Sequence, residues 1–300
     1  MFHHIVVAFD GSDRAEDALA LALRLRDADD GHITLACALT GHAWWPPHRA
    51  HHPDDVPDDV STMLAAARAQ VPPGIRVALR APVSSSPARA LTELAEEEHA
   101  DLVVVGSSRR TSDGRIRLER TAGRLLQGAP CAVAVAPAGL RTDEPLRHVA
   151  IAYDGTPEAR TALDAGYGIA AAAGAAVTVL HAYFVPDGVA AISDDDRMRA
   201  RRHAERLLDE AAELAPPIVN PRTVLLYGAP APLITRACEG IVDVLVCGSR
   251  GYGPIERALM GSVAERLMEG APYPVVVLPR KARLPDRERE SDAVVTGAPR

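Results

Sequence analysis

A glycine-rich stretch in the C-terminal half has the residue types and spacing of a phosphate-binding loop. Gly248 and Gly251 follow an apolar run, and Gly261-Ser262 precedes a helical pattern that begins near Val263. Glycines lack the Cβ atoms that would keep an anion from the backbone, and the first turn of a helix offers unpaired N–H groups. Ser262 suits the N-cap and can donate its hydroxyl to a phosphate oxygen. The stretch predicts a phosphate site, although such glycines also mark ordinary turns between strands and helices.

Lysine usage narrows the chemistry that this stretch can perform. The only lysine of the chain is Lys281, which follows the last apolar run. A Walker-type loop needs a lysine after its final glycine, a protein kinase needs one on a strand, and a Schiff-base enzyme needs a buried one. No G-x-S-x-G elbow, H-E-x-x-H sequence or paired-cysteine zinc motif occurs either. We therefore expect backbone amides, hydroxyls and Arg250 to hold phosphate without transferring it, and we predict no catalytic residue and no metal site.

Composition favours a layered α/β protein in the cytoplasm. The 300 residues suit two domains of roughly 150 each, and 47% apolar but only 4% aromatic residues indicate a core of small aliphatic side chains. The net charge of −7 and the lack of a basic patch argue against a nucleic-acid partner. No apolar run is long enough for a membrane span, and because the first residues enter a strand pattern we expect no leader. The four cysteines form no CxxC pair, so we expect reduced thiols and a cytoplasmic location.

The sequence contains an internal duplication. Residues 242–250 repeat the pattern of residues 100–108, and residues 149–156 repeat that of residues 5–12. An offset that holds over a whole domain indicates a duplicated domain, because solenoid repeats have much shorter periods. We predict a domain at 1–137, a linker at 138–146, a second domain at 147–280 and a disordered tail at 281–300.

Each half alternates strand and helix patterns. Short, continuous apolar runs indicate strands that are covered on both faces, and their alternation with helices indicates right-handed βαβ units. We predict an α/β protein with two tandem, doubly wound, five-stranded parallel-sheet domains that are Rossmann-like. Ligands of such sheets bind at the carboxyl ends of strands, where Asp154 and Gly248 should converge. The predicted strands lie near residues 3–9, 32–39, 75–81, 101–106, 131–136, 147–153, 176–183, 221–227, 243–248 and 274–279.

These residues together resemble the universal stress protein family over nearly the whole chain. The family's signature is Gly-x2-Gly-x9-Gly-(Ser/Thr) after the fourth strand, with an Asp at the end of the first strand. The second half carries the signature in full, as Asp154, Gly248, Gly251, Gly261 and Ser262. The resemblance implies an adenine nucleotide alpha-hydrolase-like fold, binding of ATP, usually with Mg²⁺, and a role as a nucleotide-dependent stress or dormancy factor.

The resemblance also implies a contact for each residue of this site. Asp154 would meet the adenosine part, with Ala152 and Tyr153 beside it. Ala182 and Cys247 would line the adenine pocket. The ribose and phosphates would be surrounded by Gly248, Ser249, Arg250, Gly251, Gly261, Ser262 and Val263.

The first half departs from the signature. It keeps Asp10, Gly106 and Ser107, but the last glycines and the serine are replaced by Arg109, Glu119 and Arg120. A glutamate repels a triphosphate, and long arginines fill the space that the backbone should occupy. We therefore expect a degenerate site here. The alternative is that the arginines of this region bind another anion; they are Arg109, Arg110, Arg115, Arg117 and Arg120.

Three functions stay open from the sequence: a nucleotide-binding regulator, a slow ATPase on the same site with Glu256 as its only candidate base, and an interaction scaffold with an empty pocket. The sequence identifies neither the regulated process nor a protein partner. The resemblance implies that the last strands of the two halves, near 131–136 and 274–279, pair antiparallel, and such pairing would also remove two exposed sheet edges. The chain would then be its own pseudo-dimer, with further homodimerisation open.

Two other features have less specific readings. The loop at residues 41–55 holds four of the eleven histidines and both tryptophans. A metal site there is conceivable, but the spacing fits no compact motif, and we favour a surface loop that covers the first-half site or a partner. His181 follows an apolar strand and is expected in the core or in a pocket wall.

Overall fold

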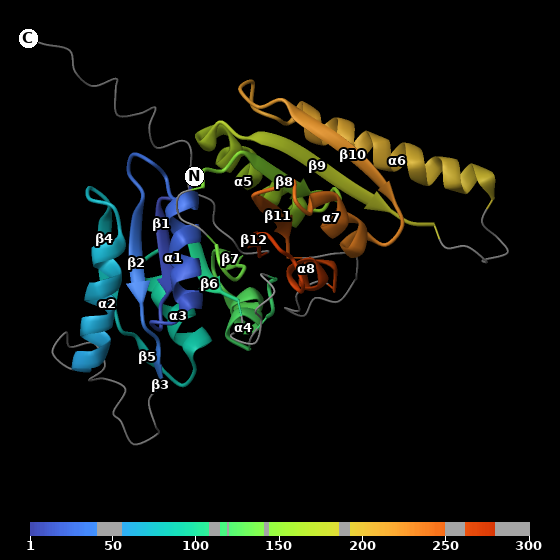
Figure 1. Cartoon of the computed structure of the whole chain (residues 1–300). Coiled ribbons are helices and arrows are strands. Elements are labelled where there is room, and N and C mark those ends of the chain that lie inside the picture. The colour runs from blue at the N-terminus through green and yellow to red at the C-terminus, as the bar shows by residue number, and fades with distance from the viewer. Residues whose placement is uncertain are drawn as a thin grey trace, which may run out of the picture.

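The computed structural model describes residues 1–40, 56–107, 115–118, 120–140, 144–185, 193–249 and 262–279, apart from the side chain of Ser262. Both halves are α/β units with five parallel strands each, as the sequence predicts (Figure 1). In the first half the strands are β1 (His4–Ala8), β2 (His32–Ala36), β4 (Arg76–Arg80), β6 (Leu102–Gly106) and β7 (Ala132–Ala136). The helices of that half are α1 (Asp13–Leu25), α2 (Asp58–Gln70), α3 (Pro87–Glu97) and α4 (Arg120–Gly128).

The second half repeats this order. Its strands are β8 (His148–Ala152), β9 (Ala176–Tyr183), β10 (Pro221–Tyr227), β11 (Val244–Gly248) and β12 (Val275–Leu278). Its helices are α5 (Pro157–Ala173), α6 (Asp194–Glu213), α7 (Pro230–Cys238) and α8 (Ser262–Met268). The sequence did not indicate the small parallel pair β3 (Leu39–Thr40) and β5 (Val83–Ser84), which lies beyond the ends of β2 and β4.

The two sheets join into one sheet of ten strands. Its order is β10-β9-β8-β11-β12-β7-β6-β1-β2-β4, and the only antiparallel pairing among these strands is that of β12 with β7. Val276 faces Ala134 at the centre of this junction. The predicted pairing of the last strands is therefore confirmed, and the chain forms an intrachain pseudo-dimer. Each unit thus covers the sheet edge that the other would expose.

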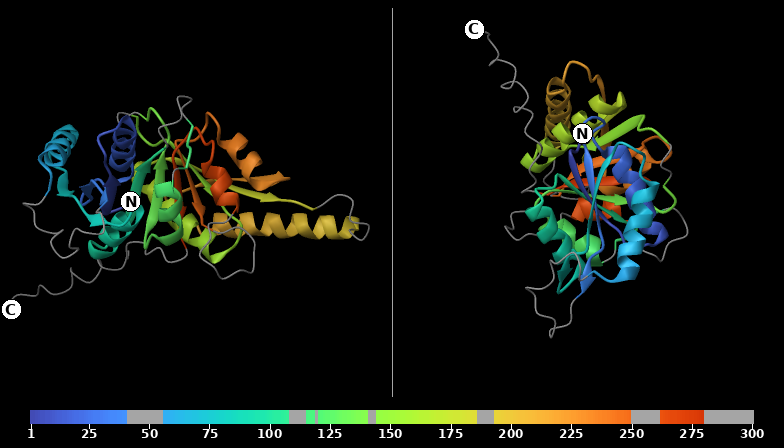
Figure 2. Two further views of the ribbon diagram at one scale, coloured as in Figure 1. Left: turned by 90° about the horizontal axis from the view of Figure 1, so that it is seen from below. Right: turned by 90° about the vertical axis from the view of Figure 1, so that its left-hand side faces the viewer.

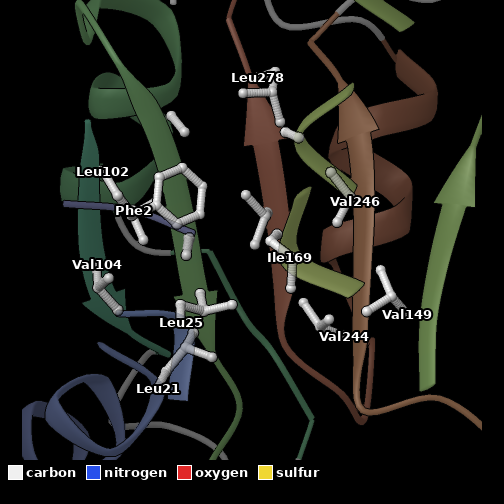
Figure 3. Packing of buried hydrophobic residues seen from close by; sticks show 14 of the residues in the cluster. Phe2, Leu21, Leu25, Leu102, Val104, Val149, Ile169, Val244, Val246 and Leu278 are labelled. Carbon is white, nitrogen blue, oxygen red and sulfur yellow. The ribbon is translucent and has the colours of Figure 1, made fainter. Parts of the chain in front are cut away.

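Helices cover both faces of the sheet (Figure 2). One hydrophobic cluster lies under α1, α2, α5 and α6, and the other lies under α3, α4, α7 and α8. Figure 3 shows part of the first cluster, in which Leu102 and Val104 of one half and Val244 and Val246 of the other line the same side of the sheet. The core thus runs through the junction without a break. No helix among the described residues is long and apolar enough to cross a membrane.

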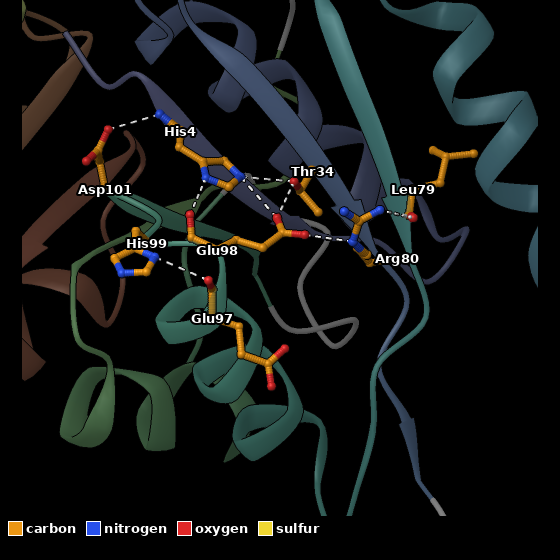
Figure 4. Close-up of polar contacts among 8 residues, drawn as sticks. All are labelled: His4, Thr34, Leu79, Arg80, Glu97, Glu98, His99 and Asp101. Atoms are coloured by element: carbon orange, nitrogen blue, oxygen red, sulfur yellow. Dashed lines mark hydrogen bonds and ion pairs between the residues drawn. The ribbon is translucent and has the colours of Figure 1, made fainter. Parts of the chain in front are cut away.

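A polar cluster joins three strands of the first half to the end of α3 (Figure 4). The His4 ring lies with Nδ1 2.9 Å from the Glu98 carbonyl oxygen and with Nε2 3.0 Å from Thr34 Oγ1. The Thr34 hydroxyl donates to Glu98 Oε2, and Arg80 Nε donates to Glu98 Oε1 at 2.7 Å. These bonds hold the start of β1, the middle of β2 and the end of β4 to the residue that follows α3.

Candidate functional site

A cavity of ≈ 60 Å³ lies at the carboxyl ends of the second-half strands. It sits where β8 and β11 run side by side, which is the point where the strand order reverses direction, and α7 and α8 form its other wall. Seven of the predicted residues line it: Ala152, Tyr153, Asp154, Ala182, Cys247, Gly248 and Val263. The structure therefore brings Asp154 and Gly248 together, as the sequence pattern predicts.

Asp154 is held by the start of the next helix. Its Oδ1 accepts hydrogen bonds from Thr156 N (3.1 Å) and from the Thr156 hydroxyl (2.6 Å). The same hydroxyl oxygen accepts from Ala159 N and so caps α5, with Pro157 in the first turn. Among the described residues nothing donates to Oδ2 of Asp154. The carboxylate is therefore fixed in orientation with one oxygen open to a hydrogen-bond donor.

Gly248 is required by helix packing. A Cβ atom at this position would lie 2.8 Å from the carbonyl carbon of Glu158 and 2.9 Å from Ala159 N, in the first turn of α5. Gly106 has the same relation to α1, since its Cβ would overlap the carbonyl oxygen of Arg14. The expected reason for this glycine was the approach of an anion, and the structure gives a second reason that holds in both halves.

The cavity wall is apolar on the side of α7 and α8. Ala152, Ala182 and Cys247 belong to, or pack against, the hydrophobic cluster of that face. Burial, together with the nearby Asp154 carboxylate, raises the pKa of the Cys247 thiol to about 12, so the thiol is uncharged at neutral pH. The Tyr153 ring belongs to the cluster on the opposite face, so Tyr153 borders the cavity with its backbone.

His181 is a positioning residue of the cavity wall. It is buried, and its Nδ1 lies 2.7 Å from the Tyr153 carbonyl oxygen. Because a carbonyl oxygen can only accept, Nδ1 carries the proton and ties the end of β9 to the end of β8. This agrees with the expected place of His181 in a pocket wall.

Sequence reasoning missed five further lining residues, namely Ala159, Pro230, Ile234, Ala264 and Leu267. Pro230 begins α7, and Ile234 lies one turn further on the same helix face. Val263 and Leu267 have the same spacing on α8. Apolar residues spaced four apart on the helix after each strand could therefore have predicted these lining residues from the sequence.

Several predicted residues lie outside the described residues. These are Arg250, Gly251, Gly261, Arg109, Arg110, Glu119 and Glu256, together with the loop at 41–55. Ser262 is the first residue of α8, and Ser249 continues the ladder by donating its N–H to the Leu278 carbonyl oxygen at 2.9 Å. Arg120 begins α4 and is exposed.

The first half has a cavity at the matching place, and with ≈ 280 Å³ it is the larger of the two. Asp10, Gly106 and Ser107 line it at the positions of Asp154, Gly248 and Ser249. Cys37 of this cavity corresponds to His181 of the other. His32 pairs with the first residue of β1 as Ala176 pairs with the first residue of β8, and Cys37 and His181 each follow these positions by five residues. The sequence did not predict a cavity of this size in the half with the incomplete signature.

The fold and the paired cavities define a tandem Rossmann-like α/β protein with a potential ligand site at the switch point of each sheet. The sequence model of the universal stress protein family matches residues 1–137 and 145–279. The chain therefore belongs to the universal stress protein family, as a tandem of two such domains.

Some relatives match both halves of the chain, and others match one half. A universal stress protein of Mycobacterium tuberculosis is 25% identical over 291 residues, which cover 92% of this chain and 96% of that protein. One from Thermus aquaticus is 32% identical over 133 residues, or 43% of this chain and 96% of that protein. The solved structure of a universal stress protein from Archaeoglobus fulgidus has a TM-score of 0.63 at 17% identity, covering 92% of this chain and 98% of its own. A Pseudomonas aeruginosa protein of unknown function has a TM-score of 0.63 at 18% identity, covering 93% of each chain. Both structural likenesses concern the fold.

Proposed function

We propose that this protein binds ATP in its second half and acts as a nucleotide-dependent regulatory or stress-response factor in the cytoplasm. The observation that carries the proposal is the second-half cavity, in which a fixed carboxylate faces an apolar wall beside the start of α8. The glycine-serine signature of the sequence ends at Ser262, where α8 begins. A helix start preceded by glycines suits a phosphate group.

Each part of the nucleotide has a candidate partner in this proposal. The open oxygen of Asp154 accepts from a hydroxyl or amino group of the adenosine part, while Ala182 and Cys247 contact the base. The backbone around Gly251, Gly261 and Ser262 surrounds the phosphates, with Arg250 as the nearby positive charge. Among the described residues no group of three or more His, Cys, Asp or Glu could hold a metal ion. Mg²⁺ would then be bound by phosphate oxygens and water, which is its usual mode with nucleotides.

Turnover of ATP should be slow or absent. Hydrolysis needs a group that orients the attacking water beside the γ-phosphate and accepts its proton. Of the two acceptors that line the cavity, Asp154 is assigned to the adenosine part, and the buried His181 is fixed in the wall by its Nδ1–H bond to the Tyr153 carbonyl oxygen. Glu256 is the remaining candidate base. A regulatory role instead requires that the segment 249–260 changes between the empty and the bound state.

Titration calorimetry tests the proposal. We expect near one ATP per chain, with binding abolished in Gly261→Val and kept in Glu119→Gln. Two ATP per chain would contradict the degenerate first site, and no binding would leave the interaction scaffold as the function. Single-turnover hydrolysis of several per second, lost in Glu256→Gln, would make the protein an enzyme. Unchanged hydrogen exchange across 249–260 on addition of ATP would contradict the regulatory switch.

A further inference from the structure

Residues 115–118 of the first half, here called the bridging segment, are bonded to the second half. Ile116 N donates to the Ala271 carbonyl oxygen, and Gly270 N donates to the Ile116 carbonyl oxygen, both at 2.8 Å. These two backbone bonds join Ile116 to two consecutive residues of the second half, across the domain boundary. Ile116 is fully buried in the cluster that also holds Leu267 of α8. The segment is therefore part of the second-half structure as much as of its own.

Side chains extend this contact to the ends of two helices. Arg115 Nη1 donates to the Gly270 carbonyl oxygen at 2.8 Å, and Nη2 donates to Glu239 Oε1 at 2.6 Å. Leu118 N donates to Glu269 Oε2 at 3.0 Å. Glu239 directly follows α7, and Glu269 directly follows α8. The bridging segment thus holds the carboxyl ends of the two helices that wall the second-half cavity.

The segment is also fixed to its own half. The Ser107 hydroxyl donates to the Arg115 carbonyl oxygen (3.3 Å) and accepts from Arg117 N (2.8 Å). Ser107 is buried directly after β6 and lines the first-half cavity. The bridging segment is therefore anchored to the central strands of one domain while it bonds to the helices of the other.

Helix α8 has little stability of its own. It has seven residues, and isolated helices shorter than about 12 residues are marginal in water. Its place depends on tertiary contacts, and at its carboxyl end Ile116 and the bonds to residues 269–271 supply them. Val263, Ala264 and Leu267 of the same helix line the cavity. A shift of the carboxyl end of α8 would consequently move the wall of the second-half site.

We propose that the first half is a positioning element for the nucleotide site of the second half, and that Arg115 is its main positioning residue. This inference rests on the proposed function of that site. Arg115 touches no part of the cavity, so its effect on ligand binding is transmitted through α7 and α8. Residues 115–118, which belong to the first-half counterpart of the glycine-rich loop, thus support the other domain.

The Arg115→Ala variant tests the inference. Because two charged hydrogen bonds to the helix ends are lost, we expect the Kd for ATP to rise about 3- to 10-fold. In the ligand-free protein, amides of residues 263–271 should exchange faster. Arg115→Lys, which keeps a charge near Glu239, should restore part of both effects. Equal Kd and equal exchange in Arg115→Ala and the unaltered protein would overturn the inference.

A matched interface variant separates positioning from general loosening. Arg24 Nη2 lies 4.0 Å from Asp243 Oδ1, and this second contact between the halves joins α1, on the face of the sheet opposite to α8, to the residue before β11. Arg24→Met should leave the Kd for ATP and the exchange of 263–271 unchanged. An equal rise in Kd in both variants would overturn the inference. If the unaltered protein binds no ATP, the proposed function fails, and the exchange of α8 in ligand-free Arg115→Ala still decides whether the segment positions that helix.

Discussion

The two halves share most of the residues that frame their cavities. Because both halves have them, these residues cannot tell which of the two cavities binds a ligand. Asp10 Oδ1 accepts from Ser12 N and from the Ser12 hydroxyl, as Asp154 does from Thr156. In each half the glycine at the end of the fourth long strand leaves room for the first turn of a helix, because it has no Cβ atom. These residues build the strand end and the helix start. Their presence is therefore explained by the fold and does not require a ligand.

In the first half, the serine after that glycine anchors the bridging segment. The Ser107 hydroxyl is occupied by the bridging segment on both its donor and acceptor sides. The Ser249 hydroxyl makes no hydrogen bond to a described residue, and its sequence neighbours are glycine and arginine. The sequences that follow the two serines differ: the first half continues into the bridging segment, and the second half carries the glycine-serine signature.

The largest effect should come from removing the two equivalent glycines one at a time. In Gly248→Ala the new Cβ meets backbone atoms of α5, which cannot move without the helix, so we expect a loss of about 1–3 kcal/mol in the free energy of unfolding. Gly106→Ala should cost more, because its Cβ would come closer still to the backbone of α1. Urea unfolding of both variants measures the difference.

Gly123→Ala serves as the control for this pair. Gly123 lies within α4, and nothing lies within 4 Å of an added Cβ. Because alanine is favoured over glycine inside a helix, this variant should be unchanged or more stable by up to about 1 kcal/mol. A Gly248→Ala variant that is as stable as the unaltered protein but fails to bind ATP would contradict this expectation. It would show that Gly248 serves the ligand alone, and this glycine would then mark a nucleotide site.

The sequence predicted the fold well because repeated patterns carry it. The five apolar runs of each half and the pairing of β7 with β12 follow from local composition and from the need to cover a sheet edge. The walls of the site at Asp154 and Gly248 followed from strand ends. The bridging segment could not be predicted, because Arg115 and Ile116 bond to residues more than 150 positions away and no local pattern marks such partners.

A smaller effect should distinguish the amino ends of the two sheets. Burial, with lesser contributions from His4 and Arg76, lowers the pKa of His32 below its ordinary value, and the second half has Ala176 at this position. The unfolded chain then binds a proton more readily than the folded one, so stability is lost as pH falls through 6.5 toward the lowered pKa. His32→Ala should flatten this part of the pH dependence of urea unfolding between pH 7 and 5 and leave stability at pH 8 nearly unchanged. Identical slopes for both proteins would contradict the assignment.

The finest comparison of the two cavities uses the cysteines. Cys131, Cys238 and Cys247 are buried, and burial raises the pKa of each to about 12. At pH 8.5 a thiol with that pKa is ionised in only about one molecule in 3,000, so these three should resist iodoacetamide in the folded protein. Cys37 is half-buried in the wall of the larger cavity, and although burial, Asp10 and Asp59 raise its pKa, reagent can reach it.

Mass spectrometry should accordingly find Cys37 as the first residue to be alkylated, and saturating ATP should leave its rate unchanged. This follows because the nucleotide is expected only in the other half, beyond β7 and β12. Slower alkylation of Cys37 in the presence of ATP would mean that the first cavity also takes nucleotide, and the two halves would then be alike in function. Slowing by adenosine but not by ATP would instead show that this cavity accepts the base and ribose and rejects the phosphates, as the arginines and the glutamate in place of the signature would require.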